Sequence, residues 1–562
     1  MQKKVFFALA ACSLFITTSC SKLGSLSADN FKVTPNPLET QGGQVPATIN
    51  GTFPEKYFQR NATITVVPEL RFKDAYGKTA AVKGTTATFQ GEKVYGNDQT
   101  ISYRMGGHYT MKTAFDYLPE MMTSEMYLTF QAKQGSKSVS IPAVKVADGV
   151  IATSELYKKT LLNGGGCIAP DSFQRVRSLK QEANVKFLIN EATLRQSELK
   201  NNSVQEWVRM LKKINADREK LNLKNVEVQA YASPEGGYEL NDKLANARQN
   251  VSEGYVRQQL NSNKVNTNID AHYTAQDWEG FQKLVQASNI QDKDVILRVL
   301  SMYKDPEQRE EQIRNMSQGF RELADYVLPE LRRSRLIINY DVVGRSDEQI
   351  KAQYSSDPTK LSVEEMLYAA TLEDDAAKKK EIYQRAAQYY DKDYRAYNNL
   401  AALAMADGDE QLAKEYIEKC FSKNSKAPEA NANLGLLALK NGKLKEAEAY
   451  LAEAIDANGF GDALGNLNIA KGNYAAAEEN FGSSFSNSAA LAQILNKNYV
   501  AARNTLNKVK NKDAMTSYLH AILSARQDNK YAAQSYLKEA LQKDPSLKAY
   551  ADNDLELAIL RK

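Results

Sequence analysis

Hydrophobic and polar residues alternate along the first part of the chain, between residues 31 and 153. The runs ATITVVPELRF, TISYRM, MYLTFQAK and SVSIPAVKV are rich in Val, Ile, Thr, Tyr and Phe, and Gly, Asn, Asp and Pro separate them. A period of two sends successive side chains to opposite faces of a strand, so one face can be buried. The pattern predicts an all-β sandwich of roughly seven strands. We find no catalytic signature in it and expect a spacer or protein-contact module.

The pattern changes over residues 181–345 to strands that alternate with helices. VKFLINEATLRQSEL begins as a strand, and the helix after it carries apolar residues at helical spacing. The strand VEVQAYAS, a second amphipathic helix, the strand-like NIDAHYT, a long helical segment and the strand LIINYDVV follow. The order predicts β-α-β-α-β, a helical insertion and a final strand, with helices over one face of a mixed sheet.

The third region, residues 361–562, is helical and repeats every 34 residues. The matching positions are Ala413 with Ala447, Leu400 with Leu434, Ala404 with Ala438, and Ile417 with Leu451. Small residues at such positions allow two helices to cross closely. The region resembles the tetratricopeptide repeat, whose period is 34 residues. We expect an α-solenoid of about six helix pairs over 361–545, with 546–562 as a capping helix, in a multidomain α+β protein.

The first residues, MQKKVFFALAACSLFITTSC, have the order of a secretory signal. Two lysines precede an apolar stretch, and small residues lead to Cys20. The end resembles a bacterial lipobox, which implies removal of residues 1–19 and acylation of Cys20, with 20–30 as a lipidated tether. An outer-membrane anchor facing the periplasm is expected, since no acidic cluster follows Cys20. The alternatives are the better-matching LAAC at Leu9–Cys12, and ordinary secretion with a chance cysteine.

Composition argues against several classes of function. A net charge of +5 over 562 residues, without a Lys/Arg run, does not suggest nucleic-acid binding. The three histidines lie far apart, and no Cys/His cluster has metal-ligand spacing, so no metal or other cofactor is expected. Nothing resembles a nucleophile elbow, a P-loop or a dinucleotide fingerprint. A disulfide between Cys167 and Cys420 is possible in an oxidising compartment but not expected.

Residues 181–345 carry three motifs, in order, of a known family. The sequences are VKFLINEATL, LNDKLANAR and RRSRLIINY. They resemble the opening strand, the Asn-x-x-Leu-x-x-x-Arg helix start and the Arg-Arg ending of the OmpA-like peptidoglycan-binding family. The matched residues of the opening strand are Phe187, Asn190, Ala192 and Leu194. Residues 154–180 and 346–360 are expected to be linkers on either side of this domain.

The resemblance implies a site for a cell-wall peptide. Arg248 would hold the carboxylate of a diaminopimelate side chain, since a guanidinium pairs bidentately with a carboxylate. Asn241 matches the asparagine at the rim of the family's site. The alternative is that Arg248 pairs with Glu239 or Asp242 on the helix surface.

The strand before this helix departs from the family pattern. Ser233 stands where the family usually has Asp, so a charge-assisted hydrogen bond contributing about 1.5–3 kcal/mol is lost. Glu235, two residues later in the turn, is a candidate to supply the missing carboxylate.

Two asparagines in the repeats are candidates for binding a peptide. Asn399 and Asn433 are 34 residues apart, at a position that lies on the concave face of tetratricopeptide repeats. There they would hydrogen-bond the backbone of an extended partner peptide. A local helix–helix hydrogen bond is the equally weighted alternative.

Together these features predict a non-enzymatic outer-membrane lipoprotein. It would contact peptidoglycan through the OmpA-like domain and scaffold a protein partner through the concave face of the repeats. The alternative is a subunit of an outer-membrane assembly or secretion complex whose OmpA-like domain no longer binds the wall. A wall hydrolase ranks third, because no nucleophile or metal set is recognisable.

Overall fold

The computed structural model describes residues 23–161, 165–290, 292–315 and 321–561. It forms two compact units: the first contains the chain up to Asp171 and from Ala370 onward, and the second contains Ser172–Ala369. The second unit is therefore an insertion in the sequence of the first. Cys20 and the predicted signal lie outside the described residues, so lipidation stays a prediction. No helix among the described residues is long and apolar enough to cross a membrane.

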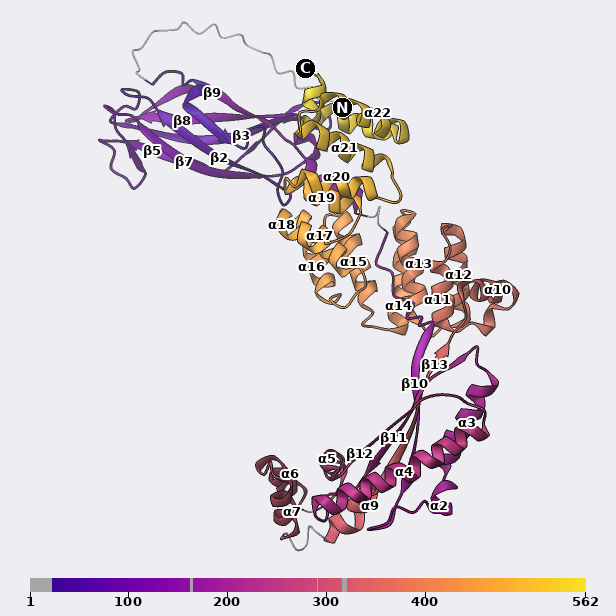
Figure 1. Cartoon of the computed structure of the whole chain (residues 1–562). Coiled ribbons are helices and arrows are strands. Elements are labelled where there is room, and N and C mark those ends of the chain that lie inside the picture. Colours follow the sequence, from indigo (N-terminus) through magenta and orange to yellow (C-terminus); the bar gives the residue numbers. More distant parts are fainter. Residues whose placement is uncertain (1–22, 162–164, 291, 316–320, 562) are drawn as a thin grey trace, which may run out of the picture. The chain divides into compact units, whose positions relative to one another are not determined.

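The N-terminal part of the first unit is a sandwich of two sheets around one core (Figure 1). Strands β1-β2-β7 form one sheet; β6-β5-β3-β8-β9 form the other, with β4 paired to β3. Residues 23–161 thus contain nine strands rather than roughly seven, because the short β4 and β6 are largely exposed and lack a clear apolar alternation. The bounds are β1 (Phe31–Thr34), β2 (Gln44–Phe53), β3 (Ala62–Lys73), β4 (Thr79–Lys83), β5 (Ala87–Gly91), β6 (Gln99–Ile101), β7 (Gly107–Asp116), β8 (Ser124–Gln134) and β9 (Lys137–Gly149).

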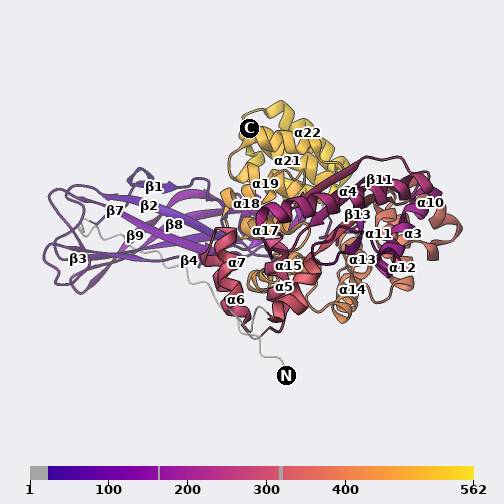
Figure 2. The ribbon, with the colours of Figure 1, turned by 60° about the horizontal axis from the view of Figure 1, so that its bottom comes forward.

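The C-terminal part of the first unit consists of helix pairs, as the 34-residue period predicts (Figure 2). Glycines and alanines lie where the helices cross: a Cβ built on Gly435 would lie 2.8 Å from Leu451 Cγ, and one on Gly465 would lie 2.7 Å from the Phe481 ring. Helices α12 to α22 fill residues 376–543 of this unit, and a short helix and a 3-10 segment follow; α11 precedes them and lies largely in the second unit, which ends at Ala369. The bounds are α11 (Val363–Thr371), α12 (Ala376–Tyr389), α13 (Tyr394–Ala406), α14 (Glu410–Lys423), α15 (Pro428–Lys440), α16 (Leu444–Ala452), α17 (Phe460–Ala470), α18 (Tyr474–Phe481), α19 (Asn487–Leu495), α20 (Tyr499–Lys508), α21 (Ala514–Arg526), α22 (Lys530–Lys543), α23 (Lys548–Asn553) and η7 (Leu555–Arg561).

The second unit contains a four-stranded mixed sheet in the order β10-β13-β11-β12. Strands β11 and β12 are parallel, and the other pairs are antiparallel. Helices α3 and α4 pack on one face, where Trp207 joins Val185, Val228 and Ile338 in a single core. This is the predicted arrangement of a mixed sheet covered on one side. The first strand, however, ends at Lys186, so Phe187, Asn190, Ala192 and Leu194, which were matched to the family's opening strand, follow it instead of lying in it. The bounds are β10 (Val176–Lys186), α2 (Gln196–Leu199), α3 (Asn202–Ala216), β11 (Leu221–Tyr231), α4 (Tyr238–Ser262), β12 (Ile269–Thr274) and β13 (Arg333–Val343).

The predicted helical insertion lies between β12 and β13 and has its own small core. Phe281, Ile296 and Leu331 are among its buried residues. The bounds of its described elements are α5 (Trp278–Ala287), α6 (Lys293–Met302), α7 (Pro306–Arg314), the π-helical turn η4 (Leu323–Val327) and α9 (Leu328–Leu331).

Both expected linkers contain ordered elements. Within 154–180, a 3-10 turn η3 (Thr153–Leu156) leads into the helix α1 (Tyr157–Thr160), and β10 begins at Val176. Within 346–360, α10 (Asp347–Ser356) and the 3-10 turn η5 (Pro358–Lys360) are present. Ser346 and Gln349 form a capping box at the start of α10. That Ser-x-x-Gln signal was available in the sequence.

We predict that Gly465→Ala destabilises the repeats. The added methyl group meets the Phe481 ring, and overpacking costs about 1–3 kcal/mol, which exceeds the gain of about 1 kcal/mol in helix propensity. The matched control is Gly254→Ala in α4, where nothing lies within 4 Å and stability should rise by about 0.5–1 kcal/mol. Urea unfolding of the two variants, with the transition of each unit followed separately, measures both changes in the free energy of unfolding. A stabilised Gly465→Ala protein would contradict the close crossing.

We predict that His520 makes the repeats less stable in acid. Burial, assisted by Lys512, lowers the pKa of His520 to about 4, against about 6.5 in an unfolded chain. The stability from the neutral ring is fully present above the unfolded pKa and is lost as the pH falls through the folded pKa, by about 3 kcal/mol in all. His520→Gln should lack this loss between pH 7 and pH 4 in urea unfolding.

Asp554 titrates in the same pH window in the opposite sense. Burial raises its pKa to about 6, so the stability that comes from its neutral form is present below its unfolded pKa and is lost as the pH rises through 6. The difference between wild type and His520→Gln, rather than the wild-type curve, therefore isolates the histidine. Parallel curves for the two proteins would show that His520 does not titrate as described.

Candidate functional site

Arg248, expected to hold a ligand carboxylate, is fully buried and bonded to the main chain of its own unit. It is 0% exposed. Its Nε donates to Glu191 O at 2.9 Å, Nη1 to Tyr231 O at 3.0 Å and Nη2 to Leu188 O at 3.2 Å. The alternative prediction, a surface ion pair of Arg248 with Glu239 or Asp242, is not observed: the guanidinium is buried and donates to main-chain oxygens. The guanidinium joins α4 to the end of β11 and to the loop after β10.

The surroundings of Arg248 are those of a core residue. Its guanidinium lies over the Phe187 ring, 5.1 Å from the ring centre. Burial lowers the pKa of Arg248 to about 10, with Arg332 acting in the same direction and Glu235 in the opposite one. The side chain therefore remains protonated at neutral pH, and its charge is stabilised by main-chain oxygens rather than by a carboxylate.

Ser233, Glu235 and Asn241 satisfy one another within the turn between β11 and α4. Ser233 Oγ donates to Glu235 Oε1 at 2.9 Å. Asn241 Nδ2 donates to the main-chain oxygens of Ser233, Glu235 and Gly236 at 3.1, 3.2 and 3.1 Å. Gly236 has φ +94°, a conformation that favours glycine. Asn241 is thus the residue that closes this turn.

Glu235, the candidate to supply the family's missing carboxylate, pairs with Arg332. Arg332 Nε donates to Glu235 Oε1 at 2.8 Å, and Nη2 lies 2.5 Å from the same oxygen. Arg332 belongs to the Arg-Arg pair before β13, which was matched to the family without a role of its own. The structure therefore gathers all four predicted residues around one turn. Ser233 Oγ, Glu235 Oε1, Asn241 Nδ2 and the Arg248 guanidinium are bonded within the unit, and peptidoglycan binding by these residues stays a prediction.

The groove of the repeats holds a segment of the same chain, residues 165–171, here called the strap. Asn433 Oδ1 accepts from Cys167 N at 2.6 Å, and its Nδ2 donates to Cys167 O at 3.0 Å. Asn399 bonds Ala169 in the same way: its Oδ1 accepts from Ala169 N at 2.7 Å, and its Nδ2 donates to Ala169 O at 3.2 Å. Each carboxamide thus bonds both main-chain groups of one residue, and Asn433 is 0% exposed. Binding of a partner peptide by these asparagines is untested, and a partner would have to displace the strap.

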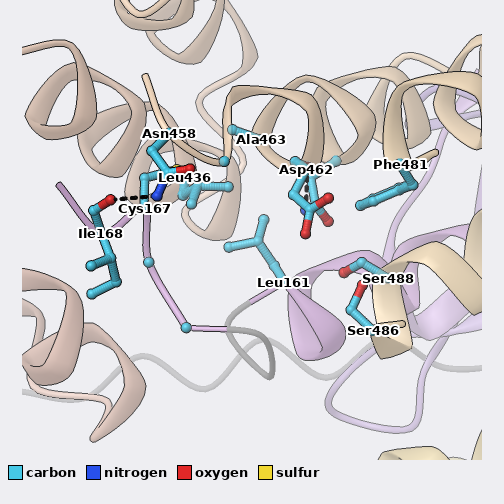
Figure 3. Close-up of a pocket in the computed structure, with 14 residues that line it drawn as sticks. Leu161, Cys167, Ile168, Leu436, Asn458, Asp462, Ala463, Phe481, Ser486 and Ser488 are labelled. Atoms are coloured by element: carbon cyan, nitrogen blue, oxygen red, sulfur yellow. Dashed lines mark hydrogen bonds between the residues drawn. The ribbon is translucent and has the colours of Figure 1, made fainter. Parts of the chain in front are cut away.

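Three further side chains, which no sequence pattern singled out, hold the strap. Asn398 Nδ2 donates to Cys167 O at 2.9 Å, and Arg395 Nη1 donates to Asp171 O at 2.9 Å. Asn458, in the loop before α17, donates to Ile168 O at 2.9 Å, as Figure 3 shows. The 34-residue period gave no signal for Asn398, since the equivalent position is Ala432.

Side chains of the strap fit closely. A Cβ on Gly166 would lie 2.6 Å from Asn433 Oδ1 and 3.0 Å from Ala402 Cβ, so only glycine fits there. Cys167 is 5% exposed, and burial raises the pKa of its thiol to about 12. Cys167 and Cys420 are both free thiols. The thiol of Cys167 is therefore protonated and shielded while the strap is in place.

The residues before the strap belong to the core of the repeats. Leu156, Tyr157 and Leu161 join one apolar cluster with residues of α13 to α21. Tyr157 OH donates to Leu439 O at 3.4 Å, and Thr153 Oγ1 donates to Glu556 Oε1 at 2.6 Å. Residues 153–161 and 165–171, most of which were expected to belong to a linker, line the groove from the last repeats toward the first ones.

The sandwich also contacts the repeats directly. Tyr474 OH donates to Thr40 O at 3.2 Å, and Gln41 Nε2 donates to Gly472 O at 3.2 Å. Sandwich, strap and repeats accordingly form the first compact unit.

A cavity of about 250 Å³ lies beside the strap (Figure 3). Leu161, Cys167, Asp462 and Phe481 are among its lining residues. Ser484 Oγ donates to Asp462 Oδ2 at 2.9 Å, and burial raises the pKa of this carboxyl. Within the described residues no group of three or more His, Cys, Asp or Glu side chains could hold a metal ion.

A larger hollow of about 660 Å³ lies in the second unit, at one end of the sheet. Three ion pairs lie among its lining residues: Arg335 with Glu182 at 2.6 Å joins β13 to β10, and Arg333 with Asp277 at 3.1 Å and Lys186 with Glu330 at 2.5 Å join the sheet to the helical insertion. The Arg335 guanidinium lowers the pKa of Glu182.

No family model matches the sequence, and no curated protein matches it. Similar solved structures include a tetratricopeptide repeat protein from Parabacteroides merdae, at 16% identity over 38% of this chain and 91% of that chain, with a TM-score of 0.27. A second is pilF of Pseudomonas aeruginosa, at 16% identity over 39% of this chain and 99% of that chain, with a TM-score of 0.25. A third is yeast Tom70, at 11% identity over 65% of this chain and 84% of that chain, with a TM-score of 0.24. TM-scores this low support no conclusion, so the description of the repeats rests on their own helix pairs and period.

We predict that Arg248→Ala destabilises the second unit by at least about 3 kcal/mol, because three main-chain oxygens lose their donor in a buried place. Arg248→Lys should recover only part of this, since one ammonium cannot match the three directions of the guanidinium. The control is Arg257→Ala, which removes an exposed ion pair with Glu253 on the same helix. It should change the free energy of unfolding by no more than about 0.5 kcal/mol. Thermal and urea unfolding measure all three. Wild-type stability of Arg248→Ala would show that the guanidinium does not hold the fold.

Proposed function

We propose that this chain is a non-enzymatic scaffold protein of the cell envelope, whose inserted second unit is a protein-contact module derived from an OmpA-like fold. One observation carries the proposal. The guanidinium that the family would direct to a wall peptide donates instead to Glu191 O, Tyr231 O and Leu188 O, with none of its surface exposed.

The chemistry of the turn supports the same conclusion. A carboxylate ligand at Arg248 would have to replace at least one main-chain oxygen, and the released carbonyl would remain buried without a donor, at a cost of about 1–3 kcal/mol. The ligand's ammonium would meet Ser233, whose hydroxyl carries no charge, and Glu235, which is already paired with Arg332. Both halves of the family's charge recognition are therefore weakened.

Peptidoglycan contact is the second candidate, and one observation favours it. Arg248, Asn241, Ser233 and Glu235 lie around a single turn, as the resemblance implies, because Arg248 bonds Tyr231 O and Asn241 bonds Ser233 O. Binding would require the loop that contains Leu188 and Glu191 to leave the guanidinium.

The location follows from the N-terminal sequence. Lipidation of Cys20 would anchor the mature chain in the outer membrane, with the described units in the periplasm. In that position the unit of sandwich, strap and repeats would carry the second unit as an insertion that is free to contact an envelope protein. The protein partner and the membrane anchor are parts of this proposal.

The test is retention by purified sacculi of a soluble protein that begins at Ser21. We expect background retention, because the wall-binding groups are occupied. A known wall-binding domain serves as the positive control. Saturable retention that a diaminopimelate-containing peptide displaces, and that a folded Arg248→Lys protein lacks, would establish wall binding and contradict the proposal.

The scaffold role needs a second measurement. Crosslinking of the full chain in the cells that produce it should give a stoichiometric protein partner whose crosslinks map to the second unit. A chain without residues 172–369 should lose that partner if its first unit still folds. Crosslinks confined to the first unit would contradict the role assigned to the insertion.

A further inference from the structure

The groove recognises the strap mainly through the strap's main chain. Asn433 and Asn399 each bond the N–H and the C=O of one residue, at Cys167 and at Ala169. Alternate residues of an extended chain point the same way, which explains the two-residue spacing between the bonded positions. Main-chain recognition of this kind does not depend on the identity of the bound segment.

Sterics supply the sequence preference. At Gly166 a Cβ would lie 2.6 Å from Asn433 Oδ1 and 3.0 Å from Ala402 Cβ. Cys167 and Ala169 are buried in places that fit small side chains, and a Cβ on Gly459 would lie 3.3 Å from Cys167 Sγ. The groove therefore selects glycine followed by small residues at alternate positions.

The strap and the residues before it are held by different forces. Leu156, Tyr157 and Leu161 are part of the apolar core of the repeats. The strap is held by Asn398, Asn399, Asn433, Asn458 and Arg395, whose polar groups would accept any extended backbone or water. Cys167 of the strap also belongs to this apolar cluster, so release of the strap removes one small side chain from the core. The other groups that release exposes are polar and can be solvated, and Leu156, Tyr157 and Leu161 stay in place.

We propose that the strap is an intramolecular ligand that keeps a peptide-binding groove closed. An extended segment of a partner protein, with a glycine in the place of Gly166 and small residues in the places of Cys167 and Ala169, can replace it. This inference goes beyond the scaffold function and does not depend on whether the second unit contacts the wall. A covalently attached segment has an effective concentration on the order of millimolar, so a peptide in trans competes poorly until the strap is released.

The test uses Gly166→Val, which should displace the strap and leave Leu156, Tyr157 and Leu161 in place. The probe is a fluorescent peptide with the sequence of residues 163–172 and alanine in the place of Cys167. We expect it to bind Gly166→Val about a hundred-fold or more tightly than wild type in anisotropy titrations. Adding Asn399→Ala should abolish the gain, and a peptide with valine in the place of Gly166 should not bind.

Thiol labelling reports the strap independently of the peptide. Cys167 should react slowly with a disulfide reagent in wild type and fast in Gly166→Val, while Cys420 stays protected in both. Gly24→Val is the matched control, since nothing lies within 4 Å of a Cβ there, and it should behave like wild type. If valine at position 166 prevents folding, Gly166→Ala is the smaller intrusion with the same expected direction.

Three results would overturn the proposal. Equal peptide binding by wild type and Gly166→Val would show that the strap does not block the groove. Fast labelling of Cys167 in Gly166→Val without peptide binding would show that the groove does not accept a segment in trans. Slow labelling of Cys167 in a folded Gly166→Val protein would show that glycine is not required there.

Discussion

The first unit depends on a buried backbone that needs hydrogen-bond partners. The strap crosses the repeat groove in an extended form, and its N–H and C=O groups have no neighbouring strand to bond with. Asn399 and Asn433 supply the missing donors and acceptors, with one carboxamide for each residue of the strap that they face. A buried peptide group without such partners would cost about 1–3 kcal/mol of stability. The asparagines remove this cost and so stabilise the path of the strap through the groove. The strap adds to the union of sandwich and repeats, which Tyr474 and Gln41 also join through direct hydrogen bonds.

In the second unit a buried charged side chain, rather than a neutral carboxamide, bonds the protein's own main chain. Arg248 is a buried cation, and three main-chain oxygens surround its guanidinium. In both units, side chains expected to contact an outside ligand bond the chain's own backbone. Sites of this kind are ambiguous in a sequence, because a group that recognises a foreign carboxylate or peptide recognises the protein's own oxygens equally well.

Periodic features were readable from the sequence, and contacts between distant segments were not. The spacing of Val204, Trp207, Leu211 and Ile214 predicted the buried face of α3, and the 34-residue period predicted the helix pairs. Residues 154–180 were expected to be a linker. The place of Cys167 within them depends on Asn433, 266 residues away, which no local pattern connects to it. The burial of Arg248 likewise depends on a loop some 60 residues earlier, whose Leu188 O and Glu191 O accept hydrogen bonds from its guanidinium.

The most direct test of the account is amide hydrogen exchange at Cys167 and Ala169 in the wild-type protein. We expect both amides to exchange slowly, with protection comparable to that of α13 and α15, because they donate to buried carboxamides. Exchange of both amides at the rate of an unstructured peptide, while α13 and α15 remain protected, would contradict it. In that case the asparagines would face an open groove, and the strap would not be part of the fold.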